Sequence, residues 1–62
     1  MAGDELRTLV HDLRTPLTLV EGFSDLLARG GDELPASERD EYVQRIAAAA
    51  REMRELLDRI RL

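Results

Sequence analysis

The sequence contains no cysteine, lysine, tryptophan or asparagine, and it has only one tyrosine and one phenylalanine. The absence of cysteine excludes disulfide bonds and thiolate metal ligands. The formal net charge of −4 argues against binding to nucleic acids or anionic membrane surfaces, because both need a basic protein face. No apolar run approaches the roughly 18 residues of a transmembrane helix. We therefore expect a soluble domain with no direct membrane contact.

Apolar residues recur in two segments with alternating three- and four-residue spacing, which is typical of packed helices. The 62 residues form a single domain, 1–62, with one helix over about 4–29 and another over about 38–61. Gly30, Gly31 and Pro35 favour a turn over 30–37, and Ser37 is a good N-cap for the second helix. The first apolar series is Leu6, Leu9, Leu13, Pro16, Val20, Phe23 and Leu27; the second is Val43, Ile46, Ala50, Met53, Leu57 and Ile60.

Further apolar residues make these stripes wider than one helix pair can cover. Val10 and Leu17 widen the first stripe on one side, and Leu19 and Leu26 widen it on the other. A chain this short buries only about 60% of its unfolded surface, and it has no disulfide bond to compensate for the small core. The predicted fold is therefore all-α: an antiparallel helical hairpin that dimerises, as a C2 homodimer, into a four-helix bundle.

His11 is the only histidine, and its helical position points away from the apolar stripe. At 100° per residue it lies about 140° from Leu6, with the small residues Thr15, Thr18 and Gly22 within about 40° of it. A lone histidine without cysteine or a second histidine does not form a metal site. What remains is nucleophilic or acid–base chemistry, in which Asp12 orients the ring or accepts its proton. The other interpretation is an ordinary surface histidine.

Pro16 lies inside the predicted helix, one turn after His11. It removes the hydrogen bond that residue 16 would donate to the Asp12 carbonyl, and its ring crowds that carbonyl, so we expect a kink. One interpretation is that tertiary packing simply tolerates the proline. The other is that the kink loosens the helix beside the histidine and lets it bend during a reaction cycle.

The run His11-Asp12-Leu13-Arg14-Thr15-Pro16-Leu17 resembles the histidine motif of one family. The family is the dimerisation and histidine-phosphotransfer domain of bacterial two-component sensor histidine kinases. Its pattern is His, an acid, an apolar residue, Arg or Lys, Ser or Thr, Pro, then Leu or Ile, and the sequence follows it without departure. The resemblance extends over nearly the whole chain and implies a signal-transduction role, in which a histidine receives a phosphoryl group and passes it on.

The resemblance assigns a role to each matching residue. It implies that His11 is the phosphoacceptor and that Asp12 is the general base that polarises it. Thr15 matches the position that holds a water when the domain helps to dephosphorylate the regulator, and Arg14 matches a basic position near phosphate. The implied regulator-binding surface consists of His11, Thr15, Thr18 and Gly22, with the turn-side half of the second helix.

The chain has no glycine-rich phosphate loop and no asparagine, so it offers no Mg–ATP site of the family's type. The resemblance implies one part of a kinase that is not active alone, with no cofactor or metal of its own. Its implied partners are a second copy of the chain, a separate catalytic domain that binds ATP and Mg²⁺, and the receiver domain of a response regulator. The implied location is the cytoplasm, and a parent protein anchored in the inner membrane is compatible with it.

Two other readings remain open from the residues alone. A purely structural helical dimeriser would form the same dimer with an inert His11. A structural dimeriser has no need of an interior proline next to an exposed histidine, so the presence of both weighs against this interpretation. A monomeric peptide-binding hairpin fits less well, because stripes this wide would leave a large apolar surface exposed.

Overall fold

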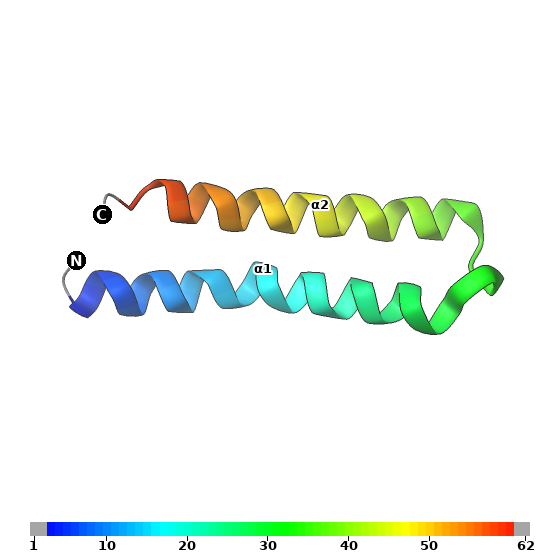
Figure 1. The fold of residues 1–62 in the computed structure, drawn as a ribbon, viewed down its shortest axis with the longest axis horizontal. Coiled ribbons are helices and arrows are strands. Elements are labelled where there is room, and N and C mark those ends of the chain that lie inside the picture. The colour runs from blue at the N-terminus through cyan, green and yellow to red at the C-terminus, as the bar shows by residue number, and fades with distance from the viewer. Residues whose placement is uncertain (1–2, 61–62) are drawn as a thin grey trace.

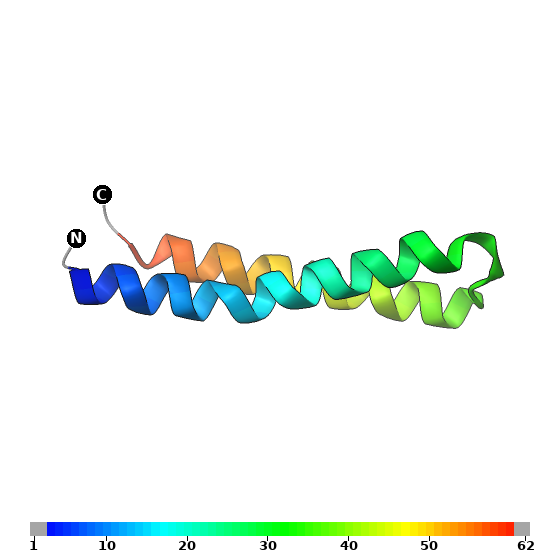
Figure 2. The same ribbon diagram turned by 90° about the horizontal axis from the view of Figure 1, so that it is seen from below.

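The structure, a computed structural model, describes residues 3–60, which form two long antiparallel helices (Figure 1). Helix α1 spans Gly3–Gly30, a short 3-10 helix η1 spans Gly31–Glu33, and α2 spans Ala36–Asp58. The beginning of α1 and the end of α2 lie at the same end of a rod about 47 Å long. Figure 2 shows the two helices crossing slightly as they run side by side. The predicted helical hairpin is therefore confirmed. Of the residues expected in the second helix, residue 61 lies outside the described residues.

The turn depends on two glycines with different tasks. Gly31 has a φ of +51°, a left-handed conformation that glycine adopts without the strain of a Cβ. A Cβ at Gly30 would overlap the Leu34 side chain, so Gly30 leaves room for Leu34 to fold back onto the end of α1. The guanidinium of Arg39 donates a hydrogen bond to the Gly31 carbonyl and ties α2 to the turn.

The second helix begins before the residue expected to cap it. Pro35 occupies the N-cap position, and Ser37 lies inside α2 without a capping role, so the prediction of a Ser37 cap is wrong. Pro35 has a φ of −56°, close to the value its ring imposes, and its carbonyl accepts the first helical hydrogen bond from the Arg39 N–H at 3.0 Å. Pro35, whose ring fixes its φ angle, thus starts the helix without a side-chain cap.

The seam between the helices is thin. Among residues 3–60 only Pro16 and Ala49 are buried, and every other seam residue is half-buried. Phe23 and Tyr42 meet across the seam near the turn, with ring centroids 5.5 Å apart. The remaining half-buried residues are Leu9, Leu13, Val20, Leu27, Gly30, Leu34, Ile46, Met53, Leu56 and Ile60.

The inward face of α2 is rotated from the one that the spacing predicts. The series expected to face inward included Val43, Ala50 and Leu57, but all three are exposed, and Val43 and Leu57 retain 51% and 50% of their accessible surface. Tyr42, Ala49 and Leu56 take their places, each one residue earlier. Three-and-four spacing fits two neighbouring registers on the same helix, so the apolar pattern alone does not select between them.

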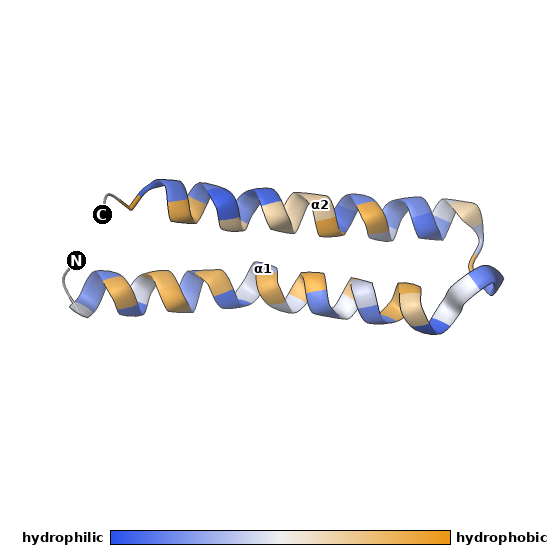
Figure 3. Ribbon diagram, in the orientation of Figure 1, coloured by the Kyte–Doolittle hydropathy of each residue, from blue (hydrophilic) through white to orange (hydrophobic). Residues whose placement is uncertain are grey.

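The structure leaves a second apolar face uncovered. Its large members are Leu6, Val10 and Leu17 on α1 and Val43 and Leu57 on α2. On each helix these residues lie about 80° around the helix axis from the seam, turned in the same direction when the helix is followed from its N-terminus. Because the two helices run antiparallel and face each other, both sets lie on the same side of the hairpin. Figure 3 shows that apolar positions recur along the full length of both helices. We call these five residues the second apolar face. Leu19 and Leu26 lie on the opposite side of α1.

Within residues 3–60, neither helix combines the length and apolar character that crossing a membrane requires.

Candidate functional site

His11 stands on the outer face of α1, where the helical wheel predicts it. Its side chain is 86% exposed, so nothing in the described part of the chain shields the ring from an approaching reactant. Regular α-helix extends on both sides of it, from Gly3 to Gly30. The imidazole is therefore a freely accessible group on a continuous helix.

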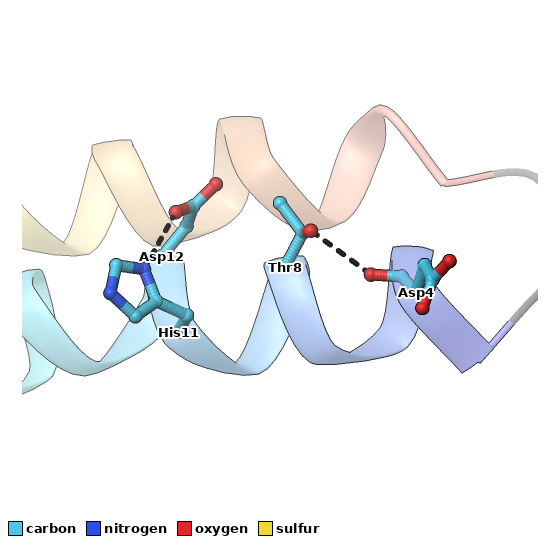
Figure 4. A network of polar contacts seen from close by, with 4 residues as sticks. All are labelled: Asp4, Thr8, His11 and Asp12. Carbon is cyan, nitrogen blue, oxygen red and sulfur yellow. Dashed lines mark hydrogen bonds and ion pairs between the residues drawn. The ribbon is translucent and has the colours of Figure 1, made fainter.

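Asp12 contacts one of the two ring nitrogens of His11. The Nδ1 atom lies 3.3 Å from Oδ1 of Asp12, and Figure 4 shows the other ring nitrogen, Nε2, on the side away from the carboxylate. A carboxylate accepts a hydrogen bond from Nδ1–H, which favours the tautomer whose Nε2 carries a free lone pair. The arrangement presents Nε2 as a nucleophile and keeps a proton acceptor behind it.

Pro16 takes a place in the seam one turn after His11. Its side chain is fully buried, while His11 and Asp12 on the preceding turn are exposed. Helix α1 continues through the proline without a break. Since proline has no N–H, the Asp12 carbonyl lacks its usual partner from residue 16. Burial of the ring helps to offset that loss, and the expected kink stays a prediction.

The two threonines that follow His11 differ in what their hydroxyls do. The Thr18 hydroxyl donates a hydrogen bond to the Arg14 carbonyl at 2.8 Å, so it is engaged with its own helix. Thr15 lies one turn after His11 and is exposed, and its hydroxyl has no hydrogen-bond partner within residues 3–60. Of the two hydroxyls, Thr15 is the one free to hold a water or a reactant near the ring.

Gly22 lies on the same outer face as His11, two turns after Thr15. A Cβ added there would meet no atom within 4 Å. The packing of this hairpin therefore does not require a glycine, although glycine in a helix interior costs about 1 kcal/mol relative to alanine. Together with Thr18, Leu19, Phe23 and Leu26 it lines a shallow recess on α1.

The scan against protein families finds the His Kinase A (phospho-acceptor) domain, matched over residues 1–62. The chain belongs to this family. Searches of curated proteins and of solved structures give no match. The family assignment confirms the predicted resemblance, and it agrees with the helical hairpin that the structure shows. His Kinase A domains serve histidine kinases in phosphoacceptor and dimerisation roles.

His11 in this His Kinase A domain lies between an acidic and a basic recess. On one side Asp4, Glu5 and Asp12 line a recess at the open end of the hairpin, together with Thr8, Leu9, Leu56, Arg59 and Ile60. There the Thr8 hydroxyl donates to the Asp4 carbonyl at 2.9 Å (Figure 4). On the other side the recess is lined by Leu6, Arg7, Val10, His11 and Arg14.

Arg7 was missed when the sequence was considered alone, although a signal was present. It lies four residues before His11, a spacing that places two side chains on the same helix face. The family motif starts at His11 and therefore does not include Arg7. The other expected site residues are exposed, apart from the buried Pro16.

Proposed function

We propose that this chain is the phosphoacceptor and dimerisation domain of a sensor histidine kinase. In this proposal His11 receives a phosphoryl group from ATP held by a separate catalytic domain and passes it to an aspartate of a response regulator. The observation that carries the proposal is the exposed His11 ring, with Nδ1 next to Asp12 and Nε2 free, in a member of a phospho-acceptor family. The site of action would be the cytoplasm, where ATP and response regulators are available.

The geometry supports a direct nucleophilic displacement. Nε2 of His11 attacks the γ-phosphorus of ATP, a new N–P bond forms, and the bond from phosphorus to the β–γ bridging oxygen breaks as ADP leaves. The imidazole would gain positive charge as this bond forms. Asp12 stabilises that charge and accepts the Nδ1 proton, so phosphohistidine is left with a neutral ring. ATP and Mg²⁺ would be held by the catalytic domain and not by this chain.

The second step of the cycle, transfer of the phosphoryl group to the regulator, uses the same face of α1. The phosphoryl group on Nε2 is attacked by a carboxylate oxygen of the receiver aspartate, the N–P bond breaks, and Nδ1 regains a proton. In the opposite direction of signalling, the free Thr15 hydroxyl would position a water for attack on the regulator's acyl phosphate. Its place one turn after His11 puts it within the same contact area.

Dimerisation would cover the second apolar face. One hairpin fully buries only Pro16 and Ala49 among its described residues, which is too little for an independent core. A twofold axis through that face would bring Leu6, Val10, Leu17, Val43 and Leu57 of both copies together. The result is the four-helix bundle, and the His11 face remains outside it.

Receiver binding would use the outer face of α1 between His11 and the turn, with the half of α2 that is nearer the turn. Gly22 supports this placement, because the packing of the hairpin does not require a glycine there and Gly22 lines a shallow recess on the surface. A glycine that costs folding stability and serves no internal contact is expected where another backbone approaches closely.

Gly22→Ala tests this proposal through two opposite effects. We expect the free energy of unfolding of the domain to rise by about 0.5–1 kcal/mol, since alanine is the better helix former. We also expect phosphoryl transfer from His11 to the cognate receiver domain to slow by roughly tenfold, because the methyl group blocks close approach. The measurement is the rate at which label moves from the purified phosphorylated chain to the receiver.

Gly3→Ala is the matched control, since a Cβ there also meets no atom within 4 Å and Gly3 lies at the start of α1. It should leave transfer unchanged. Equal transfer rates for Gly22→Ala and the unmodified chain would place the receiver elsewhere. Failure of label to reach any receiver would remove the phosphotransfer half of the proposal.

A further inference from the structure

Two arginines flank His11 on the same helix face. Arg7 lies four residues before it and Arg14 three residues after it, spacings at which side chains on a helix are direct neighbours. All three line one recess of about 390 Å³, whose remaining walls, Leu6 and Val10, belong to the second apolar face. A partner hairpin on that face would close this wall and leave the side next to His11 open. The recess lies on the side of His11 opposite to the acidic recess that includes Asp12.

The charges of these two arginines are uncompensated. Within residues 3–60, neither Arg7 nor Arg14 has a carboxylate within 4 Å. Three other arginines pair with an acid four residues away: Arg29 with Asp25 at 2.9 Å, Arg45 with Glu41 at 3.7 Å, and Arg54 with Asp58 at 3.5 Å. Arg39, Arg51 and Arg59 have no such pair within residues 3–60, but none of them lies beside His11. Within residues 3–60, this acidic chain thus keeps two arginines without an ion pair beside its one histidine.

We propose that Arg7 is a positioning residue for phosphoryl transfer, which with Arg14 attracts the anionic phosphodonor and holds the phosphoryl group on His11. Guanidinium groups bind phosphate oxygens with paired, charge-assisted hydrogen bonds. Asp12 lies at Nδ1, and the two arginines line the recess on the other side of His11. The inference rests on His11 being the phosphoacceptor, but Arg7 lies outside the motif that suggests this role.

The test uses the chain alone with phosphoramidate, a small anionic donor that needs no catalytic domain. Nε2 attacks its phosphorus, the P–N bond of the donor breaks, and ammonia leaves. At low ionic strength we expect the second-order rate of His11 labelling to fall about threefold in Arg7→Gln and about tenfold in Arg7→Glu, since one unit charge lies a few ångströms from the anion in water. Arg7→Lys should keep most of the rate.

Salt and a matched variant separate this effect from loss of structure. In about 0.5 M NaCl the differences between the rates should become smaller, because the Debye length falls to roughly 4 Å. Arg51→Glu changes the net charge by the same amount as Arg7→Glu, on an exposed α2 residue that also lacks an ion pair within residues 3–60. His11 in this variant should be labelled at the rate of the unmodified chain.

Three results would overturn the proposal: no labelling of His11 by phosphoramidate, equal rates for the Arg7 variants and the unmodified chain at low salt, or an equal loss in Arg51→Glu. The proposed function fails separately, if His11 labels with phosphoramidate but never from ATP in the presence of the catalytic domain. In that case the Arg7 effect on the small donor would still be measured, so the two failures remain distinguishable.

Discussion

Leu17→Glu is expected to split the proposed dimer, with the dissociation constant rising about a thousandfold. Leu17 is 45% exposed in the single hairpin and belongs to the second apolar face. Covering the exposed 45% of this side chain stabilises an interface by about 1 kcal/mol, and a glutamate placed there costs about 1 kcal/mol more. The twofold axis counts both effects twice, so about 4 kcal/mol disappears. Helix content should fall with dissociation, because Pro16 and Ala49 are the only buried residues among those described. Sedimentation velocity and far-UV circular dichroism over a concentration series measure both.

Leu19→Glu is the matched control for this variant. Leu19 lies on the same helix, is 44% exposed, and points to the opposite side of the hairpin. The identical substitution there should leave the dimer intact. The unmodified protein should also melt at a higher temperature as its concentration rises, as coupled folding and association require. A Leu17→Glu protein that stays dimeric, or a Leu19→Glu protein that dissociates equally, would show that the hairpins pair through another surface.

Asp12→Asn should slow phosphorylation of His11 by ATP and the catalytic domain by about a hundredfold. Removal of a positioned proton acceptor typically costs two to four orders of magnitude. Asparagine keeps the size of the side chain and a hydrogen-bonding oxygen, so it can still face Nδ1 of His11 but cannot take the proton. The initial rate of labelling at saturating ATP is the quantity to compare.

Asp12→Glu separates the charge from the exact length of the side chain. A glutamate at this position satisfies the family pattern, so this variant should recover most of the rate lost in Asp12→Asn. Both side chains lie on the exposed face, and neither change should alter thermal stability appreciably. Labelling of Asp12→Asn within twofold of the unmodified chain would mean that the contact at 3.3 Å has no part in the chemistry.

The hairpin could be predicted because several local signals agree. Gly31 stands at the position where the backbone needs a positive φ, and Pro35 disfavours continuation of the first helix. The outward direction of His11 followed from the position of the apolar stripe on the same helix. The register of α2 could not be predicted, because Tyr42 and Val43 each begin a three-and-four series and only contact with α1 decides between them.

The environment of the site was less accessible to sequence reasoning than its motif. The motif marks His11 and the residues after it, whereas the recess that joins Arg7 to Arg14 depends on which neighbouring side chains leave open space. The difference between Thr15 and Thr18 likewise depends on a hydrogen bond to the Arg14 carbonyl, which no spacing reveals. Gly22 was noticed as small, but only the structure shows that nothing inside the hairpin requires it.

The proposed phosphoacceptor role of His11 is tested most directly by the chemistry of the phosphate bond that should form on this chain. The chain is incubated with ATP and the purified catalytic domain of its parent kinase, and the modified residue is mapped beside a His11→Gln variant. We predict a label that is stable in base, lost in acid and confined to His11, with none on His11→Gln. A folded dimer that remains unlabelled by an active catalytic domain, or that carries an acid-stable phosphate on a hydroxyl, would contradict this account and favour a purely structural dimeriser.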